Sequence, residues 1–156
     1  MCNNHGDNNH HHSIDQKIET IQEVLDQKGI STTFLQLEDG TENAEEVAQI
    51  LECEVGQILK ASLFHTAKDR TPILVLASGP KRVTEQFVQT IAGEKVFLEN
   101  DHVCPILSKD KIETLIDADL VEYPELWASA GIPNIIFSLE GDELQYLTGG
   151  KLINIR

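Results

Sequence analysis

Hydrophobic positions in the first third of the chain recur at helical spacing and then at strand spacing. Ser13 and Gln16 form a capping-box pattern that predicts a helix start. The apolar residues that follow share one helix face, namely Ile14, Ile18, Ile21, Val24 and Leu25. Gly29 predicts the end of this helix. A strand is expected at 32–37, and Thr41 predicts the cap of a second, short helix.

The next segment predicts a central β-hairpin. The strand expected at about 57–65 has apolar residues on both faces, and a polar turn at 67–71 separates it from the apolar run 72–77. A strand that is apolar on both faces lies inside a sheet. Lys60 and Ser62 point to the same face of this strand. A lysine in such surroundings is costly unless it faces a pocket or a partner.

The second half of the chain predicts more strands, with short helices between them. Helices are expected at 83–91 and 142–147, and 123–127 predicts a short helix or turn with Trp127 as a core anchor. Strands are expected at 95–98, 111–116, 134–139 and 152–155. This mixture predicts an α+β fold, not a regular alternation of strands and helices. We expect a disordered His- and Asn-rich tail at 1–12 and one domain at 13–156.

Charge and cysteine content narrow the classes of function. The 156 residues include 12 Lys plus Arg and 26 Asp plus Glu, for a formal net charge of -14. This balance argues against a DNA-coating protein and against binding to an anionic membrane surface. Segment 60–82 is the exception, with five bases and one acid. The three widely spaced cysteines and the lack of an apolar leader predict a reduced, cytoplasmic protein.

Few other residues predict chemistry on their own. His102 and Cys104 lie two residues apart, which allows a Cys–His nucleophile or half of a zinc site. A small buried thiol beside a loop histidine is the favoured interpretation, so no metal or other cofactor is expected. Asp117 and Asp119 alternate with apolar residues at a strand end, which predicts a turn or surface role.

Several segments, in one order, resemble the YbaK family of editing domains associated with prolyl-tRNA synthetase. The segments that carry the resemblance are 41–48, 55–60, 73–79, 115–120, 130–134 and 147–150. Their order and spacing match over most of 13–156. The resemblance implies a compact, mixed, barrel-like sheet surrounded by helices. It also implies a pocket in which mischarged aminoacyl-tRNA is hydrolysed.

The resemblance also implies which residues form the site. The family's essential strand lysine corresponds to Lys60, which would act on the ester carbonyl or the terminal phosphate while the tRNA's own ribose hydroxyl assists the water. The family's Gly-x-x-Pro loop falls on His102, Val103, Cys104 and Pro105, with His102 in place of the glycine. We expect these loop residues, with Ser62, to bind the substrate.

Two hypotheses for function follow. The first is a freestanding deacylase that acts in trans on the acylated 3′ end of tRNA carrying a small amino acid of the cysteine, alanine or proline type. The alternative is a catalytically silent module on the same fold that binds an aminoacyl group or an aminoacyl-tRNA synthetase. The histidine in place of the loop glycine motivates this alternative, because glycine permits a close backbone approach that histidine resists.

Overall fold

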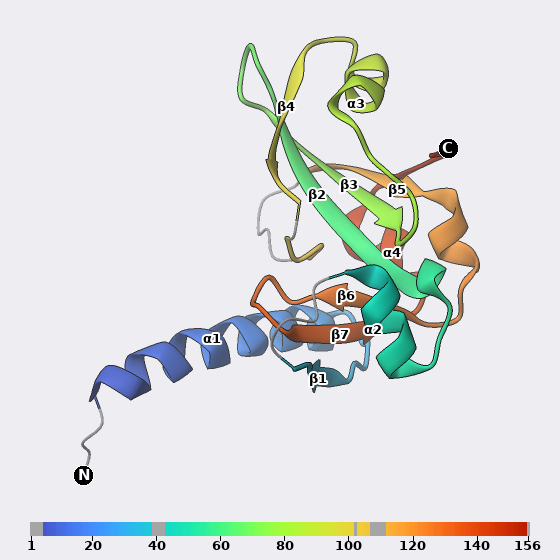
Figure 1. Ribbon diagram of the computed structural model, residues 1–156. Coiled ribbons are helices and arrows are strands. Elements are labelled where there is room, and N and C mark those ends of the chain that lie inside the picture. Colours follow the sequence, from blue (N-terminus) through green and yellow to red (C-terminus); the bar gives the residue numbers. More distant parts are fainter. Residues whose placement is uncertain (1–4, 39–42, 102, 107–111, 156) are drawn as a thin grey trace.

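A computed structural model describes residues 5–38, 43–101, 103–106 and 112–155 (Figure 1). Four α-helices lie within these residues: α1 (His5–Gln27), α2 (Ala44–Leu51), α3 (Glu85–Ala92) and α4 (Glu143–Thr148). Two 3₁₀ turns accompany them, η1 (Val55–Gln57) and η2 (Ala118–Glu122). The strands are β1 (Phe34–Gln36), β2 (Ile58–Thr66), β3 (Pro72–Ser78), β4 (Val96–Asn100), β5 (Glu113–Asp117), β6 (Leu126–Ser129), β7 (Ile135–Leu139) and β8 (Lys151–Ile153).

The strands form one mixed sheet of eight members in the order β1-β7-β6-β2-β3-β5-β8, with β4 paired to β2. Parallel pairing joins β2 to β6, β3 to β5, and β5 to β8. The remaining pairs are antiparallel. The expectation of an α+β fold with a mixed sheet surrounded by helices is confirmed.

Strand β2 is the centre of the sheet, as the sequence predicted. It pairs with β3 along Leu59–His65 to form the expected hairpin. Its other edge is shared by two short strands, because β6 pairs only at Ile58 and Leu59 whereas β4 pairs from Leu63 onwards. No strand pairs with this edge at Lys60–Ser62 among the described residues.

The two faces of the sheet carry separate hydrophobic cores. Leu59, Ala61 and Leu76 belong to the larger core, which α1 and α4 cover through Ile21 and Leu144. The opposite face carries two smaller clusters. One contains Phe64, Val75 and Ala77 with α3, and the other contains Ile58 and Trp127 with α2. In Figure 1, α2 lies beside the start of β2 and α3 beside its far end.

Three local predictions differ from the structure. Helix α1 begins at His5 instead of Ser13. Helix α2 is capped by Asn43, whose Oδ1 accepts the Glu46 N–H at 2.8 Å, and the predicted cap Thr41 lies outside the described residues. The expected helix or turn around Trp127 is strand β6, because Trp127 and Ala128 pair with β2 and β7 on either side. Trp127 is buried, which confirms it as a core anchor.

The helices of the described residues were compared with the length and hydropathy of membrane-spanning helices. None of the helices in this part of the chain has the length and apolar character needed to cross a membrane.

Candidate functional site

Lys60 lies on the sheet face that carries the two smaller clusters. Its partner across the hairpin is Ala77, whose side chain belongs to the cluster under α3. Ile58, two residues earlier, packs into the cluster under α2. Lys60 therefore lies in the interval between two apolar clusters, where it is half-buried.

Ser62 shares this interval with Lys60. It is directly opposite Val75 in β3 and is buried, with 9% of its surface exposed. Ala61, between them in sequence, faces the larger core on the other side of the sheet. The alternation predicted for the strand is thus confirmed, and it brings Lys60 and Ser62 together.

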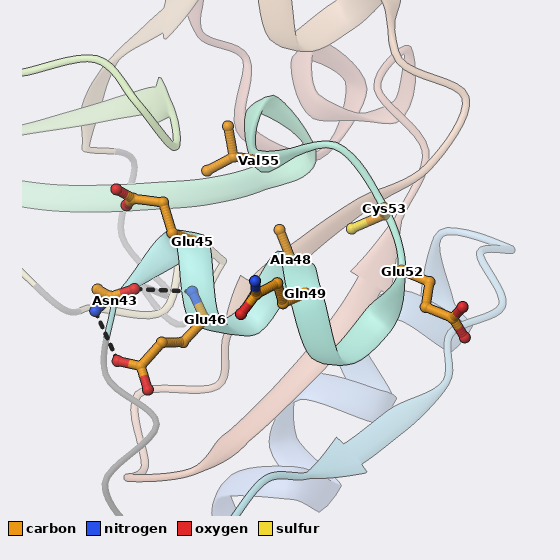
Figure 2. A pocket seen from close by; sticks show the side chains of 8 residues that line it. All are labelled: Asn43, Glu45, Glu46, Ala48, Gln49, Glu52, Cys53 and Val55. Carbon is orange, nitrogen blue, oxygen red and sulfur yellow. Dashed lines mark hydrogen bonds between the residues drawn. The ribbon is translucent and has the colours of Figure 1, made fainter.

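Lys60 has charged neighbours of both signs. Burial lowers the pKa of Lys60 from its ordinary value, while Asp101 and Glu45 oppose this by raising it and Arg82 adds to the lowering. Figure 2 shows Glu45 projecting from α2 towards the neighbouring strand, whereas Glu46 and Glu52 project away from it. The Lys60 Nζ also donates a hydrogen bond to the Lys81 carbonyl oxygen at 2.5 Å. A partly desolvated, oriented cation of this kind can stabilise negative charge on a bound oxygen.

The predicted loop lies against the open edge of β2. The Val103 N–H donates to the Ala61 carbonyl oxygen at 3.2 Å, at the point where neither β4 nor β6 pairs with β2. Pro105 is buried, and Cys104 packs into the larger core. The structure therefore brings the segment 103–105 beside the strand of Lys60 and Ser62. His102 lies outside the described residues.

Cys104 has the properties of a structural thiol. Burial raises the pKa of its thiol from 9.0 to about 12, although a backbone hydrogen bond at Ile106 and the charge of Lys17 act in the opposite direction. At neutral pH the side chain is a protonated thiol and a poor nucleophile. Within the residues that the structure describes, no group of three His, Cys, Asp or Glu side chains could hold a metal ion.

Asp117 has the expected turn role, because its Oδ1 accepts the Asp119 N–H at the start of η2, but it does not lie at the surface. Its side chain is 1% exposed, whereas that of Asp119 is 58% exposed and follows the prediction. The Asp117 carboxylate accepts the Ser78 N–H at 3.1 Å and the Lys81 Nζ at 2.9 Å. Sequence reasoning missed this contact because it depends on the parallel pairing of β3 and β5, which brings their carboxyl ends to the same edge of the sheet. The available signal was a carboxylate directly after an apolar strand.

A shallow depression formed by α2 and the segment that follows it is a poor candidate for the site. Its walls include Glu46, Gln49 and Glu52 with the half-buried Cys53 (Figure 2). Burial raises the pKa of the Cys53 thiol, and the charges of Glu125 and Glu54 raise it further. The glutamates at the rim repel the phosphates of a nucleic acid, and the protonated thiol is a poor nucleophile. The interval around Lys60 is the better candidate.

Comparison with known proteins identifies one matching family and several similar solved structures. A family model described as an aminoacyl-tRNA editing domain matches residues 38–147. The chain is 27% identical to a candidate trans-editing enzyme for prolyl tRNA synthetase, with a TM-score of 0.78 over 90% of this chain and 96% of that one. It is 25% identical to a protein from computational epitope grafting onto scaffolds, with a TM-score of 0.77 and the same coverage.

A third solved structure, described only as a hypothetical protein, is 19% identical and has a TM-score of 0.75 over 87% of this chain and 98% of that one, so it shows a shared fold. No curated protein sequence matches the chain.

Proposed function

Because the chain belongs to the aminoacyl-tRNA editing domain family, we propose that it hydrolyses the ester of mischarged tRNA carrying a small amino acid, of the cysteine, alanine or proline type. The similarity to a candidate trans-editing enzyme for prolyl tRNA synthetase supports action in trans. The observation that carries the proposal is the position of Lys60. It is a half-buried cation at the centre of the sheet, and the 103–105 segment is hydrogen-bonded to the next residue of its strand.

Lys60 is the proposed catalytic residue. Hydrolysis adds water across the bond between the aminoacyl carbonyl carbon and the ribose oxygen, so the free amino acid and the ribose hydroxyl are the products. Negative charge builds on the carbonyl oxygen as the water attacks. A fixed ammonium on a rigid strand stabilises that oxygen, or holds the adjacent terminal phosphate, without reorganising during the reaction.

The substrate-binding residues of the proposal are Ser62 and the loop residues His102, Val103, Cys104 and Pro105. Ser62 offers a hydroxyl beside Lys60, and the 103–105 segment lies at the open edge of the strand. Cys104 contributes through its backbone and its volume, because its thiol is protonated and packed into the core. In this proposal these groups border the site of a small aminoacyl group.

The partners in this proposal follow from the reaction. The enzyme binds the acylated 3′ end of tRNA, in the cytoplasm where aminoacyl-tRNA is made. An aminoacyl-tRNA synthetase that holds the body of the tRNA is a compatible second partner.

A deacylation assay on Cys-, Ala- and Pro-tRNA tests the proposal. We expect Lys60→Ala to lower the enzyme-dependent rate on the preferred substrate by about 100- to 1000-fold, as loss of an oxyanion-stabilising group does. Lys68→Ala is the matched control, because Lys68 is an exposed lysine in the turn beyond the far end of β2. The control should retain the wild-type rate.

Two results would contradict the proposal in different ways. Full activity of Lys60→Ala would remove Lys60 from the mechanism. Absence of hydrolysis of any of the three substrates by the wild type would favour the silent binding module. In that case His102→Gly restores the glycine of the family loop, and activity gained by this variant would identify an editing site that has lost function.

A further inference from the structure

Asp117 is a buried carboxylate for which the proposed chemistry has no direct use. It ends strand β5, and it has three hydrogen-bond donors around it. Besides the contacts from Ser78 and Lys81, the Asp119 N–H donates to its Oδ1 at 3.1 Å. A buried ion pair is weak evidence for stability alone, because desolvation offsets most of the attraction. The geometry it imposes on its neighbours is therefore the more informative property.

Those neighbours form the tight turn that follows β3. The Lys81 N–H donates to the Ser78 carbonyl oxygen at 2.9 Å, which closes a β-turn over 78–81. Asp117 accepts from both ends of this turn, through the Ser78 N–H and the Lys81 Nζ. The Ser78 hydroxyl also donates to the Gly56 carbonyl oxygen at 2.7 Å, so the turn is anchored to the segment that leads into β2.

The same turn presents the Lys81 carbonyl oxygen to the Lys60 ammonium. We propose that Asp117 is a positioning residue for Lys60, acting by fixing the 78–81 turn so that the Lys81 carbonyl oxygen holds the ammonium in place. The inference rests on the proposed function, because it assigns Asp117 a role through Lys60. Asp117 itself does not touch the substrate.

Asp119 provides a comparison within the same network. Its carboxylate lies 2.7 Å from the Lys81 Nζ, a shorter separation than that of Asp117. Asp119 is exposed, however, and the Ser78 N–H donates its hydrogen bond to Asp117 and not to Asp119. Loss of the Asp119 carboxylate removes one of the two carboxylates that pair with the Lys81 Nζ. The 78–81 turn stays hydrogen-bonded to Asp117 at both ends. Loss of the Asp117 carboxylate releases Lys81 from the buried side and weakens the bond from Ser78.

The first measurement follows Lys60 directly. NMR spectra of protein labelled with ¹³C-lysine contain one Hε–Cε signal pair for Lys60, assigned by its absence in Lys60→Ala. A fixed side chain gives two inequivalent geminal Hε protons, and a freely rotating one gives a merged signal. We expect inequivalent protons in the wild type and in Asp119→Asn, and merged protons in Asp117→Asn. Inequivalent protons in Asp117→Asn would overturn the inference.

The second measurement uses kinetics. We expect Asp117→Asn to lower kcat/KM for deacylation by about 10- to 100-fold through misplacement of Lys60, and Asp119→Asn to stay within about twofold of wild type. Combined with Lys60→Ala, Asp117→Asn should add no further loss. Ile21→Ala, which destabilises the larger core from the opposite face, controls for a general loss of stability.

The outcomes separate the two proposals. If Lys60→Ala is fully active, the proposed catalytic role of Lys60 fails. If Lys60→Ala is impaired while Asp117→Asn is unimpaired, or lowers activity equally in the presence and absence of Lys60, only the positioning role of Asp117 fails.

Discussion

At the scale of single residues, burial decides which polar side chains are available for chemistry. Lys60 and Cys104 both lie near the open edge of β2, yet their environments differ. The lysine is half-buried among charges of both signs, whereas the thiol is packed into the larger core. Desolvation penalises the charged form in both cases. For the thiol this leaves the neutral, unreactive form, so the Cys–His nucleophile is disfavoured against the lysine.

We expect Cys104 to resist alkylation in the native protein. With a thiol pKa of about 12, only about one part in ten thousand is thiolate at pH 8. Peptide-level mass spectrometry after iodoacetamide treatment should find Cys104 unmodified until the protein is unfolded.

The raised pKa of Cys104 also predicts a dependence of stability on pH. The unfolded thiol ionises near its ordinary 9.0 while the folded one stays protonated to about 12, so this contribution to stability is complete below pH 9 and is lost as pH rises towards 12. In the alkylation experiment, rapid labelling of Cys104 in the native protein together with loss of activity would contradict the first of these two predictions and support a thiol nucleophile.

At the scale of elements, the site depends on two short strands that leave a gap. Strands β6 and β4 cover the beginning and end of one edge of β2, and the segment at Val103 hydrogen-bonds to the strand between them. On the other edge, the turn after β3 approaches the start of β2 closely. Gly79 makes this approach possible, because a Cβ there would lie 2.3 Å from the Val55 carbonyl oxygen and 3.1 Å from that of Ile58.

Substitution of Gly79 by alanine should therefore be costly. We expect Gly79→Ala to lower the free energy of unfolding by more than about 2 kcal/mol, because the new methyl group meets backbone atoms that cannot move aside. Gly93→Ala is the comparison, since Gly93 has open space around it and only a left-handed φ of 76°. Its cost should be about 1 kcal/mol. Denaturant unfolding of both variants measures the difference, and equal costs would contradict the close approach.

At the scale of the whole molecule, the basic segment 60–82 divides into two groups. Lys60, Lys81 and Arg82 lie near the start of β2, and Lys81 is paired with Asp117 and Asp119. Lys68 and Arg70 lie in the turn at the far end of the hairpin, about 20 Å away at the rise of a strand. The five bases therefore form no continuous surface for a phosphate backbone, and the remaining acidity of the chain opposes one.

Weak, end-directed binding of tRNA follows from this distribution. We expect an acylated acceptor-stem minihelix to be deacylated with kcat/KM within about threefold of full-length tRNA, and the logarithm of the binding constant to fall with the logarithm of salt concentration at a slope shallower than about -2. Steady-state kinetics on both substrates and a salt titration measure these quantities. A steep slope, or a strong preference for the full tRNA, would indicate contacts along the tRNA body.

Much of the fold and part of the site were predictable from local patterns. The alternation around Lys60 predicted a central strand, and the polar turn predicted its hairpin partner. The structure confirms both. They were predictable because the periodicity of apolar side chains depends on the local sequence. Order and spacing of several segments also predicted the family. The same alternation paired Lys60 with Ser62 on one face, which the structure confirms.

The remaining features needed the tertiary structure, because they join residues far apart in the chain. The parallel pairing of β3 with β5 placed Asp117 beneath the turn of Ser78 and Lys81, although nothing local distinguished it from the exposed Asp119. Likewise, the tertiary structure alone showed that β6 and β4 each pair with only one end of β2, which leaves the edge between them open for Val103. The sequence by itself determined which strand carries the lysine. Strand order and burial decided which groups surround that lysine, because both arise from contacts between distant segments.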